Sequence, residues 1–273
     1  MAARPLVSFV NVIAALVVLC FTMSVLLEVA GAAARPAGAL LGKNSLGYTL
    51  LVMINTLKRT FLVLYPPLLG ILALEGGPAA VVRTIYCCFA FALLPLLMAT
   101  LARKRLIAAC GCFISLYSEG RNITFAIKQA VRAFLTFSVE QRARMTTLDE
   151  SVGPATSLFQ FDVRLFMLAT VIQVFYTIAL FAINLVGAYC EPYGPVVYQL
   201  TGLVSALGTL IWAFALDPQL SRKFDEGKDI ARTYHSLLLA NWACNVFLAP
   251  LLLWFILLMI WQLSGPLCGL QNN

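Results

Sequence analysis

Long apolar runs dominate the hydrophobic pattern of this chain, and short polar stretches separate them. A helix needs about 20 residues to cross the hydrocarbon core of a bilayer, and each run is long enough. The runs lie at 7–33, 46–74, 79–102, 165–189, 196–216 and 237–263. The pattern predicts an all-α polytopic membrane protein with about six transmembrane helices, in a single transmembrane domain over residues 1–273.

Two adjacent cations, Lys58 and Arg59, interrupt the second run near its midpoint. The apolar pieces on either side, 46–57 and 60–74, are each too short to cross a bilayer alone. Each cation would cost roughly 2.5–3.5 kcal/mol at the bilayer centre. A chain keeps such charges where they face a polar cavity, a partner or an anionic ligand. The alternative is a broken segment that holds both cations at the lipid headgroups.

The stretch between the third and fourth runs, 103–160, is basic and amphipathic. It opens with Arg103, Lys104 and Arg105, and a short apolar piece at 106–117 follows. Beyond it, apolar side chains recur at three- and four-residue steps with cations between them, as in a helix lying on a membrane surface. The apolar positions are Ile123, Ala126, Ile127, Ala130, Val131, Phe134 and Phe137, and the cations are Lys128, Arg132 and Arg142. The positive-inside rule predicts that this insert is cytoplasmic.

Composition agrees with the membrane class. The chain is 61% hydrophobic and 11% charged, which excludes an ordinary soluble domain. Its net charge of +7 is explained by basic cytoplasmic loops and not by nucleic acid binding. We expect the first loop, with Arg35 and Lys43, and the loop at 217–232 to be cytoplasmic as well. The cation-poor loops at 75–78 and 191–195 then face outward, and an even number of spans puts both termini outside.

Two cysteines, Cys190 and Cys268, would lie together at the outer face in this topology. They are candidates for a disulfide if that face is oxidising. Equal mobility on reducing and non-reducing gels, with both thiols open to alkylation, would remove the idea. Cys110 and Cys112 resemble a metal-binding pair only weakly, because the single histidine, His235, is far away in the sequence.

No known catalytic or nucleotide-binding motif occurs in the chain. It contains no zinc motif, phosphate-binding loop, dinucleotide fingerprint or nucleophile elbow. The acids Asp225, Glu226 and Asp229 are interleaved with Lys223 and Lys228, which argues against a compact metal site. We therefore expect no metal, no cofactor and no enzymatic activity.

Polar residues inside the runs are further candidates for function. Glu28 is either a boundary residue, a salt-bridge partner of Lys58 or Arg59, or a buried carboxylate that couples transport to a proton or ion. Five amides also fall inside the runs: Asn55, Gln173, Asn184, Asn241 and Asn245. Hydrogen bonding between packed helices is their ordinary use, and lining a hydrophilic cavity is the alternative. Asn241 and Asn245 are four residues apart and share one helix face.

Several pieces of the sequence, in order, resemble the Amj family, the alternate lipid II flippases of bacteria. KRTFLVLYPPLLG is similar to that family's second span, with matches at Arg59, Thr60, Pro67, Leu68, Leu69 and Gly70. ATVIQVFYTIALFA resembles the fourth span, and GLVSALGTLIWAFALDPQLS resembles the fifth, which ends in the Asp217–Pro218 turn. Pro67, Gly70, Asp217 and Pro218 would then be structural.

The resemblance implies different roles for the two adjacent cations. Arg59 falls on the family's arginine and Thr60 on its threonine, whereas Lys58 stands where the family has a serine. Arg59 is therefore the preferred pyrophosphate ligand, and its planar guanidinium suits bidentate contact with an oxyanion. The first run lacks the family's histidine, and Leu62 and Tyr65 replace its polar residues. A related undecaprenyl-linked saccharide is thus as compatible with the pattern as lipid II.

The leading hypothesis is a flippase of an undecaprenyl-pyrophosphate-linked saccharide in the bacterial cytoplasmic membrane. Its partners would be the lipid-linked saccharide and membrane lipids, with no nucleic acid. A membrane phosphatase or glycosyltransferase is a weaker hypothesis, because it requires clustered acids or histidines. A non-catalytic accessory or scaffold subunit of a cell-envelope complex is the third.

Overall fold

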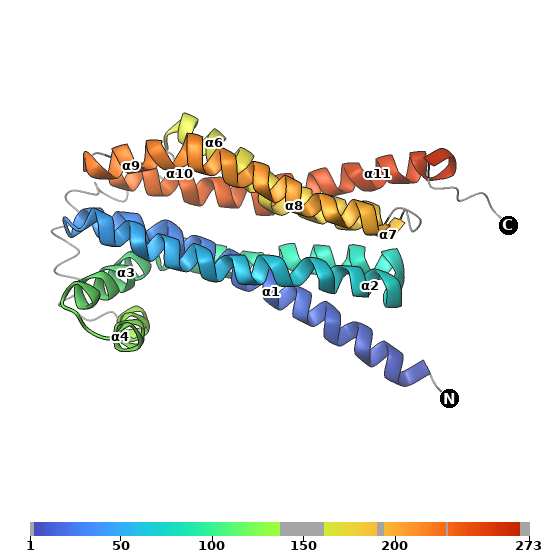
Figure 1. Ribbon diagram of the computed structural model, residues 1–273, viewed down its shortest axis with the longest axis horizontal. Coiled ribbons are helices and arrows are strands. Elements are labelled where there is room, and N and C mark those ends of the chain that lie inside the picture. The colour runs from blue at the N-terminus through green and yellow to red at the C-terminus, as the bar shows by residue number, and fades with distance from the viewer. Residues whose placement is uncertain (1–2, 137–160, 190–193, 228, 268–273) are drawn as a thin grey trace.

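The computed structural model describes residues 3–136, 161–189, 194–227 and 229–267, which are helical apart from short turns and contain no strand. In chain order the elements are α1 (Ala3–Leu40), α2 (Asn44–Leu101), α3 (Arg103–Ser118), α4 (Ile123–Thr136), α6 (Val163–Gln173), η1 (Val174–Ile178), α7 (Ala179–Tyr189), α8 (Gly194–Ile211), η3 (Trp212–Leu216), α9 (Asp217–Asp225), α10 (Ile230–Trp242), η4 (Ala243–Leu248) and α11 (Ala249–Leu267). The η elements are π-helical segments. Figure 1 shows the long helices running roughly along one axis of the molecule.

Five helical stretches are long and apolar enough to cross a membrane. They are Phe9–Leu40, Asn44–Leu101, Val163–Tyr189, Gln199–Asp225 and Ile230–Gln262. The prediction of a helical chain with several membrane-length apolar segments is confirmed for the described residues.

The longest of these stretches, α2, is two helices that fold back on each other. Its backbone leaves helical geometry at Gly77, where φ is 71°. Tyr65 and Phe89, on either side of Gly77, both place their rings against Phe21, at centroid distances of 6.0 Å and 5.9 Å. A straight helix would hold these two residues about 36 Å apart. The arms 44–76 and 78–101 are therefore antiparallel, and they correspond to the predicted second and third segments.

The first helix is longer than the sequence predicts. We expected a loop near Arg35, but α1 continues through Arg35 and Pro36 to Leu40. Arg35 is buried, with 7% of its surface exposed, and it pairs with Asp217. The assignment of Arg35 to a loop was therefore wrong. Proline removes one helical hydrogen bond, and the packing of α1 against α2 preserves the helix across it.

The fifth predicted span also continues past its expected end. Asp217 and Pro218 do not terminate the helix, because α9 follows η3 directly and runs to Asp225. The π-helical turn at Trp212–Leu216 ends two residues before Pro218, and Pro218 lies in the first turn of α9, where proline is tolerated. The expectation that this pair ends the span was wrong.

Helices α1 and α2 come into direct backbone contact at two glycines. A Cβ atom on Gly38 would lie 2.7 Å from the Cα of Gly47, and one on Gly47 would lie 2.9 Å from the Cα of Gly38. Only glycine permits this backbone contact. The contact sits beside the turn at Gly42, where φ is 65°, and it holds the start of α2 against the end of α1.

The loops predicted to be cytoplasmic lie at one end of the bundle. Lys43 Nζ donates to Ser118 Oγ at 2.6 Å, and Asn44 Nδ2 donates to Asp225 Oδ1 at 3.1 Å. Lys223 pairs with Asp162 at the start of α6. The N-terminal end of α1 and the C-terminal end of α11 lie at the opposite end of the bundle (Figure 1). We call the end of the bundle that carries Lys43 and Lys223 the basic end.

Two shorter helices pack beside the basic end. α3 contacts α1, and α4 packs on α3 through the buried side chains of Ala126 and Ala133. A second stripe of α4 is exposed and apolar, formed by Ile123, Ile127, Val131 and Leu135. Lys128 and Arg132 border this stripe and are exposed. Phe137, Arg142 and the rest of the predicted insert to residue 160 lie outside the described residues.

Candidate functional site

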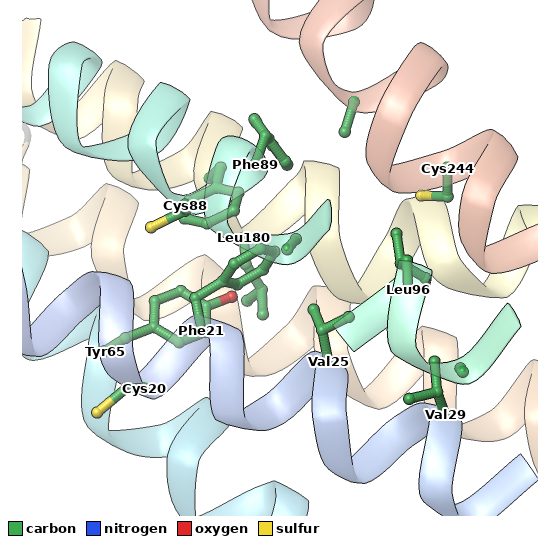
Figure 2. Packing of buried hydrophobic residues seen from close by; sticks show 14 of the residues in the cluster. Cys20, Phe21, Val25, Val29, Tyr65, Cys88, Phe89, Leu96, Leu180 and Cys244 are labelled. Atoms are coloured by element: carbon green, nitrogen blue, oxygen red, sulfur yellow. The ribbon is translucent and has the colours of Figure 1, made fainter. Parts of the chain in front are cut away.

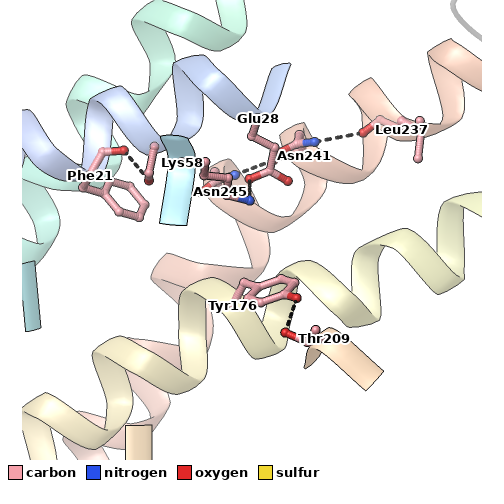
Figure 3. Close-up of polar contacts among 9 residues, drawn as sticks. Phe21, Glu28, Lys58, Tyr176, Thr209, Leu237, Asn241 and Asn245 are labelled. Carbon is pink, nitrogen blue, oxygen red and sulfur yellow. Dashed lines mark hydrogen bonds and ion pairs between the residues drawn. The ribbon is translucent and has the colours of Figure 1, made fainter. Parts of the chain in front are cut away.

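An ion pair joins the first two helices in the interior of the bundle. Lys58 Nζ donates to Glu28 Oε2 at 2.8 Å, and the two side chains are 11% and 14% exposed. Lys58 Nζ also lies 5.3 Å from the centre of the Tyr176 ring, within cation–π range. The Tyr176 hydroxyl is hydrogen-bonded to Thr209 Oγ1 at 2.9 Å (Figure 3). One chain of contacts therefore links α1 and α2 to η1 and α8.

Arg59 differs from its neighbour in having no partner of opposite charge within the described ranges of the chain. Its side chain is exposed on the surface of the helix bundle, and among the described residues it forms no ion pair. It lies about 22 Å along α2 from Asn44, close to the midpoint of the first arm. The structure thus separates the two cations: Glu28 neutralises Lys58, whereas no acid of the described part of the chain pairs with Arg59.

A second buried ion pair lies closer to the basic end. Arg35 donates from Nη2 to Asp217 Oδ1 at 2.7 Å and from Nη1 to Ser221 Oγ at 2.9 Å. The guanidinium carbon is 4.7 Å from the centre of the Tyr48 ring. Sequence reasoning missed this cluster, because the first apolar run ends at residue 33 and Arg35 was counted as a cation of the first cytoplasmic loop. Asp217 was expected only to be structural.

Both ion pairs line one cavity of about 260 Å³, which we call the central cavity. The cavity also contacts Arg59 and lies between α1, the first arm of α2, η1, η3 and α10. A neighbouring cavity of about 410 Å³ at the basic end shares Arg35, Tyr48 and Phe224 with it. The Arg35–Asp217 pair therefore stands between the central cavity and the basic end.

The central cavity reaches the side of the bundle between α2 and α8, and we call this part of the cavity its lateral edge. Val52, Thr56 and Arg59 of α2 and Ala213 of η3 line it and are exposed on the outside of the bundle. The first arm of α2 makes little contact with α8. In a bilayer this edge would face the lipid.

Three of the five predicted amides line the cavity. They are Asn55, Gln173 and Asn241, and the last two are each 4% exposed. Asn241 Nδ2 donates to the Leu237 carbonyl at 3.2 Å (Figure 3), and its Oδ1 has no hydrogen-bond partner among the described residues. Gln173 Oε1 also lacks a partner. Buried amide oxygens are rarely left without a hydrogen-bond donor. Gln173 and Asn241 therefore mark a wall of the cavity to which a ligand could donate hydrogen bonds.

The other two amides belong to the packing around the cavity. Asn245 Nδ2 donates to the Asn241 carbonyl at 3.0 Å, and Asn184 Nδ2 donates to the Leu180 carbonyl at 2.8 Å. Neither residue lines the cavity. Each nevertheless has an unpaired Oδ1, so they match Asn241 in local bonding and differ from it in position.

A cluster of aromatic side chains lies beyond the cavity, away from the basic end. Phe181 contacts Phe21, Tyr65 and Phe89 at centroid distances of 5.0, 5.4 and 5.3 Å. Tyr65 is two helical turns beyond Lys58 and is completely buried. Figure 2 shows Phe21, Tyr65 and Phe89 packed between the helices. All four side chains are buried, so the helices pack tightly against one another at this level of the bundle.

Each of three long helices carries a π-helical segment beside the cavity. Tyr176 lies in η1, Trp212 and Ala213 lie in η3, and η4 begins two residues after Asn241. π-Helical turns are rare and occur often at functional sites. No periodicity in the sequence indicated them, and Tyr176, Thr209 and Trp212 read there as ordinary span residues.

The remaining predicted residues lie away from the cavity. Thr60 is exposed and does not line it. Pro67 is exposed within α2, and a Cβ on Gly70 would meet open space, so packing does not require glycine there. Cys190 and Cys268 lie outside the described residues. Among the described residues, no three His, Cys, Asp or Glu side chains lie close enough to hold a metal ion.

Burial also keeps the two neighbouring cysteines of α3 protonated. It raises the pKa of Cys110 to about 12 and raises the pKa of Cys112. Cys110 donates to the Ala30 carbonyl at 3.8 Å and packs as a small hydrophobic residue.

Comparison with known proteins adds no assignment. No family model matches the chain, and no curated protein and no solved structure matches it.

Proposed function

We propose that this protein translocates the headgroup of an undecaprenyl-pyrophosphate-linked saccharide, lipid II or a related cell-envelope precursor, across the bacterial cytoplasmic membrane. The observation that carries the proposal is the central cavity with its lateral edge at Arg59. A lipid flippase must admit an anionic headgroup between its helices while the polyprenyl tail stays in lipid. A cavity open sideways at mid-depth meets that requirement.

The charge of the cavity supports an anionic ligand. Arg35, Lys58 and Arg59 line it together with Glu28 and Asp217, which leaves one positive charge in excess. The excess charge belongs to Arg59, because the other two cations are paired. In a site with low-dielectric walls, one uncompensated guanidinium attracts and orients a phosphate group.

The arrangement around the cavity supports alternating access. The buried aromatic cluster packs the helices together on one side of the cavity, and the Arg35–Asp217 pair lies on the side of the basic end. Translocation would require the aromatic cluster to part and the ion pair to rearrange. The π-helical segments beside the cavity are the natural points for the helices to bend, since their hydrogen bonding is already irregular.

The proposal includes a topology of six crossings. Each arm of α2 is longer than the roughly 30 Å hydrocarbon core, so α2 accounts for two crossings and the other four apolar stretches for one each. Because the basic end carries most of the loop cations, it would be cytoplasmic. Both termini would then be outside, and α4 would lie on the inner membrane surface with its exposed apolar stripe in the headgroup region.

The test is translocation by the purified chain alone. Reconstituted into vesicles, it should move a headgroup-labelled undecaprenyl-pyrophosphate-linked disaccharide to the opposite leaflet faster than protein-free vesicles do. The same gene should support growth of a bacterial strain depleted of its own lipid II flippases. An accessory subunit would instead be inactive alone and gain activity only with partner proteins, which would contradict the proposal. Release of inorganic phosphate from the substrate would indicate an enzyme.

A further inference from the structure

We propose that the amide wall of the cavity, formed by Asn55, Gln173 and Asn241, binds the first sugar ring of the headgroup, while Arg59 binds the adjoining phosphate. The inference rests on the proposed function and names the part of the substrate that each side of the cavity recognises. It starts from two buried oxygens, Gln173 Oε1 and Asn241 Oδ1, that have no hydrogen-bond partner in the described part of the chain.

The orientation of the Asn241 amide is fixed by its surroundings. Its Nδ2 donates to the Leu237 carbonyl at 3.2 Å, so a rotated amide would place two oxygens together. The Oδ1 atom therefore remains an acceptor. Gln173 adds a second acceptor, on α6. Two acceptors on different helices call for a ligand with several donors.

The chemistry of the wall matches a sugar better than a second anion. The ionised groups near it, Glu28 and Lys58, already neutralise each other. A phosphate oxygen is an acceptor and cannot satisfy an amide carbonyl, whereas sugar hydroxyls and N-acyl N–H groups donate hydrogen bonds. Tyr176 and Trp212 add aromatic surface to the same cavity, against which the apolar face of a sugar ring can pack.

The size of the cavity limits what it holds. Its 260 Å³ is slightly below the usual range for small-molecule sites. A phosphate and one sugar ring are of the right order, and a whole oligosaccharide or peptide is not. The remainder of a larger headgroup would extend through the lateral edge or toward the cavity at the basic end.

The experiment compares two lipids that differ only in the sugar. Binding of undecaprenyl pyrophosphate and of its disaccharide-linked form is measured on the purified full-length chain in detergent. Gln173→Met and Asn241→Leu should each weaken binding of the sugar-bearing lipid by about 2- to 10-fold, the loss of one hydrogen bond, and leave the sugar-free lipid unchanged. Arg59→Ala should weaken both lipids alike.

Asn184→Leu is the matched control. Asn184 has the same local bond and the same unpaired Oδ1 as Asn241, but it does not line the cavity. It should leave the affinities for both lipids, and their ratio, at wild-type values. A ratio that falls equally in Asn184→Leu and Asn241→Leu would mean that packing, not contact, is responsible, and would overturn the inference.

The possible failures are distinguishable. If the wild-type chain binds neither lipid, the proposed function itself fails. If it binds both lipids equally, or if the amide substitutions weaken both to the same extent, the sugar site is wrong while the proposed function stands.

Discussion

The buried Glu28–Lys58 pair allows a quantitative prediction. Its atoms are 2.8 Å apart, and both side chains are at least 86% buried. Removing one partner leaves the other charge uncompensated in the interior, which costs about 3–5 kcal/mol. Replacing both with apolar side chains of similar volume is often close to neutral. We therefore expect Glu28→Met and Lys58→Met each to lower the free energy of unfolding by about 3–5 kcal/mol, and the double variant to recover most of that loss.

The assay is reversible unfolding of the purified protein in detergent micelles by titration with sodium dodecyl sulfate, followed by tryptophan fluorescence. The control is Arg222→Ala, since Arg222 and Glu226 form a pair of similar length, 3.0 Å, with side chains 83% and 42% exposed. That exposed pair should contribute no more than about 0.5 kcal/mol. If both single substitutions at Glu28 and Lys58 cost less than 1 kcal/mol and their effects simply add, the two charges are not coupled in a buried site and the reasoning fails.

Three further predictions follow from the geometry. Gly38→Ala should lower the free energy of unfolding by about 1–3 kcal/mol, because its Cβ meets backbone, whereas Gly70→Ala in open space should be neutral or stabilising in the same titration. Lys223 and backbone N–H groups in the first turn of α6 lower the pKa of Asp162, so the ionised carboxylate stabilises the fold. This stabilisation is complete above about pH 5 and is lost as the pH falls below about 4. The difference in unfolding free energy between wild type and Asp162→Asn should therefore be constant above about pH 5 and shrink at lower pH. Glu28→Gln should remove any dependence of translocation on an imposed proton gradient, and a wild-type response at every gradient would exclude Glu28 as the coupling group.

The sequence pattern was sufficient to predict the long helices, because membrane spans are long and uniformly apolar. It was also sufficient to select Glu28, Lys58 and Arg59, since charges in such spans are costly and therefore conspicuous. The structure brings all three to one cavity. Gln173 and Asn241 were identified for the same reason, as polar residues in apolar surroundings.

Other features depended on information that the pattern does not carry. Arg35 was placed in a loop because it follows the first apolar run and carries a charge, although tertiary contacts with Asp217 and Ser221 keep it within the helix. Which amides face the cavity depends on the rotation of each helix about its axis. The π-helical segments change that rotation partway along three spans, so a regular helical period misplaces the residues beyond them.

The most direct test of the central claim is the initial rate of headgroup translocation in vesicles that contain wild type, Arg59→Ala or Arg83→Ala. Both arginines are exposed residues of α2, but only Arg59 lines the cavity. Loss of a charge-assisted contact worth about 1.5–3 kcal/mol predicts that Arg59→Ala slows translocation by about 10- to 150-fold. Arg83→Ala should retain the wild-type rate. Equal rates for all three proteins would contradict the assignment of Arg59 as the headgroup ligand.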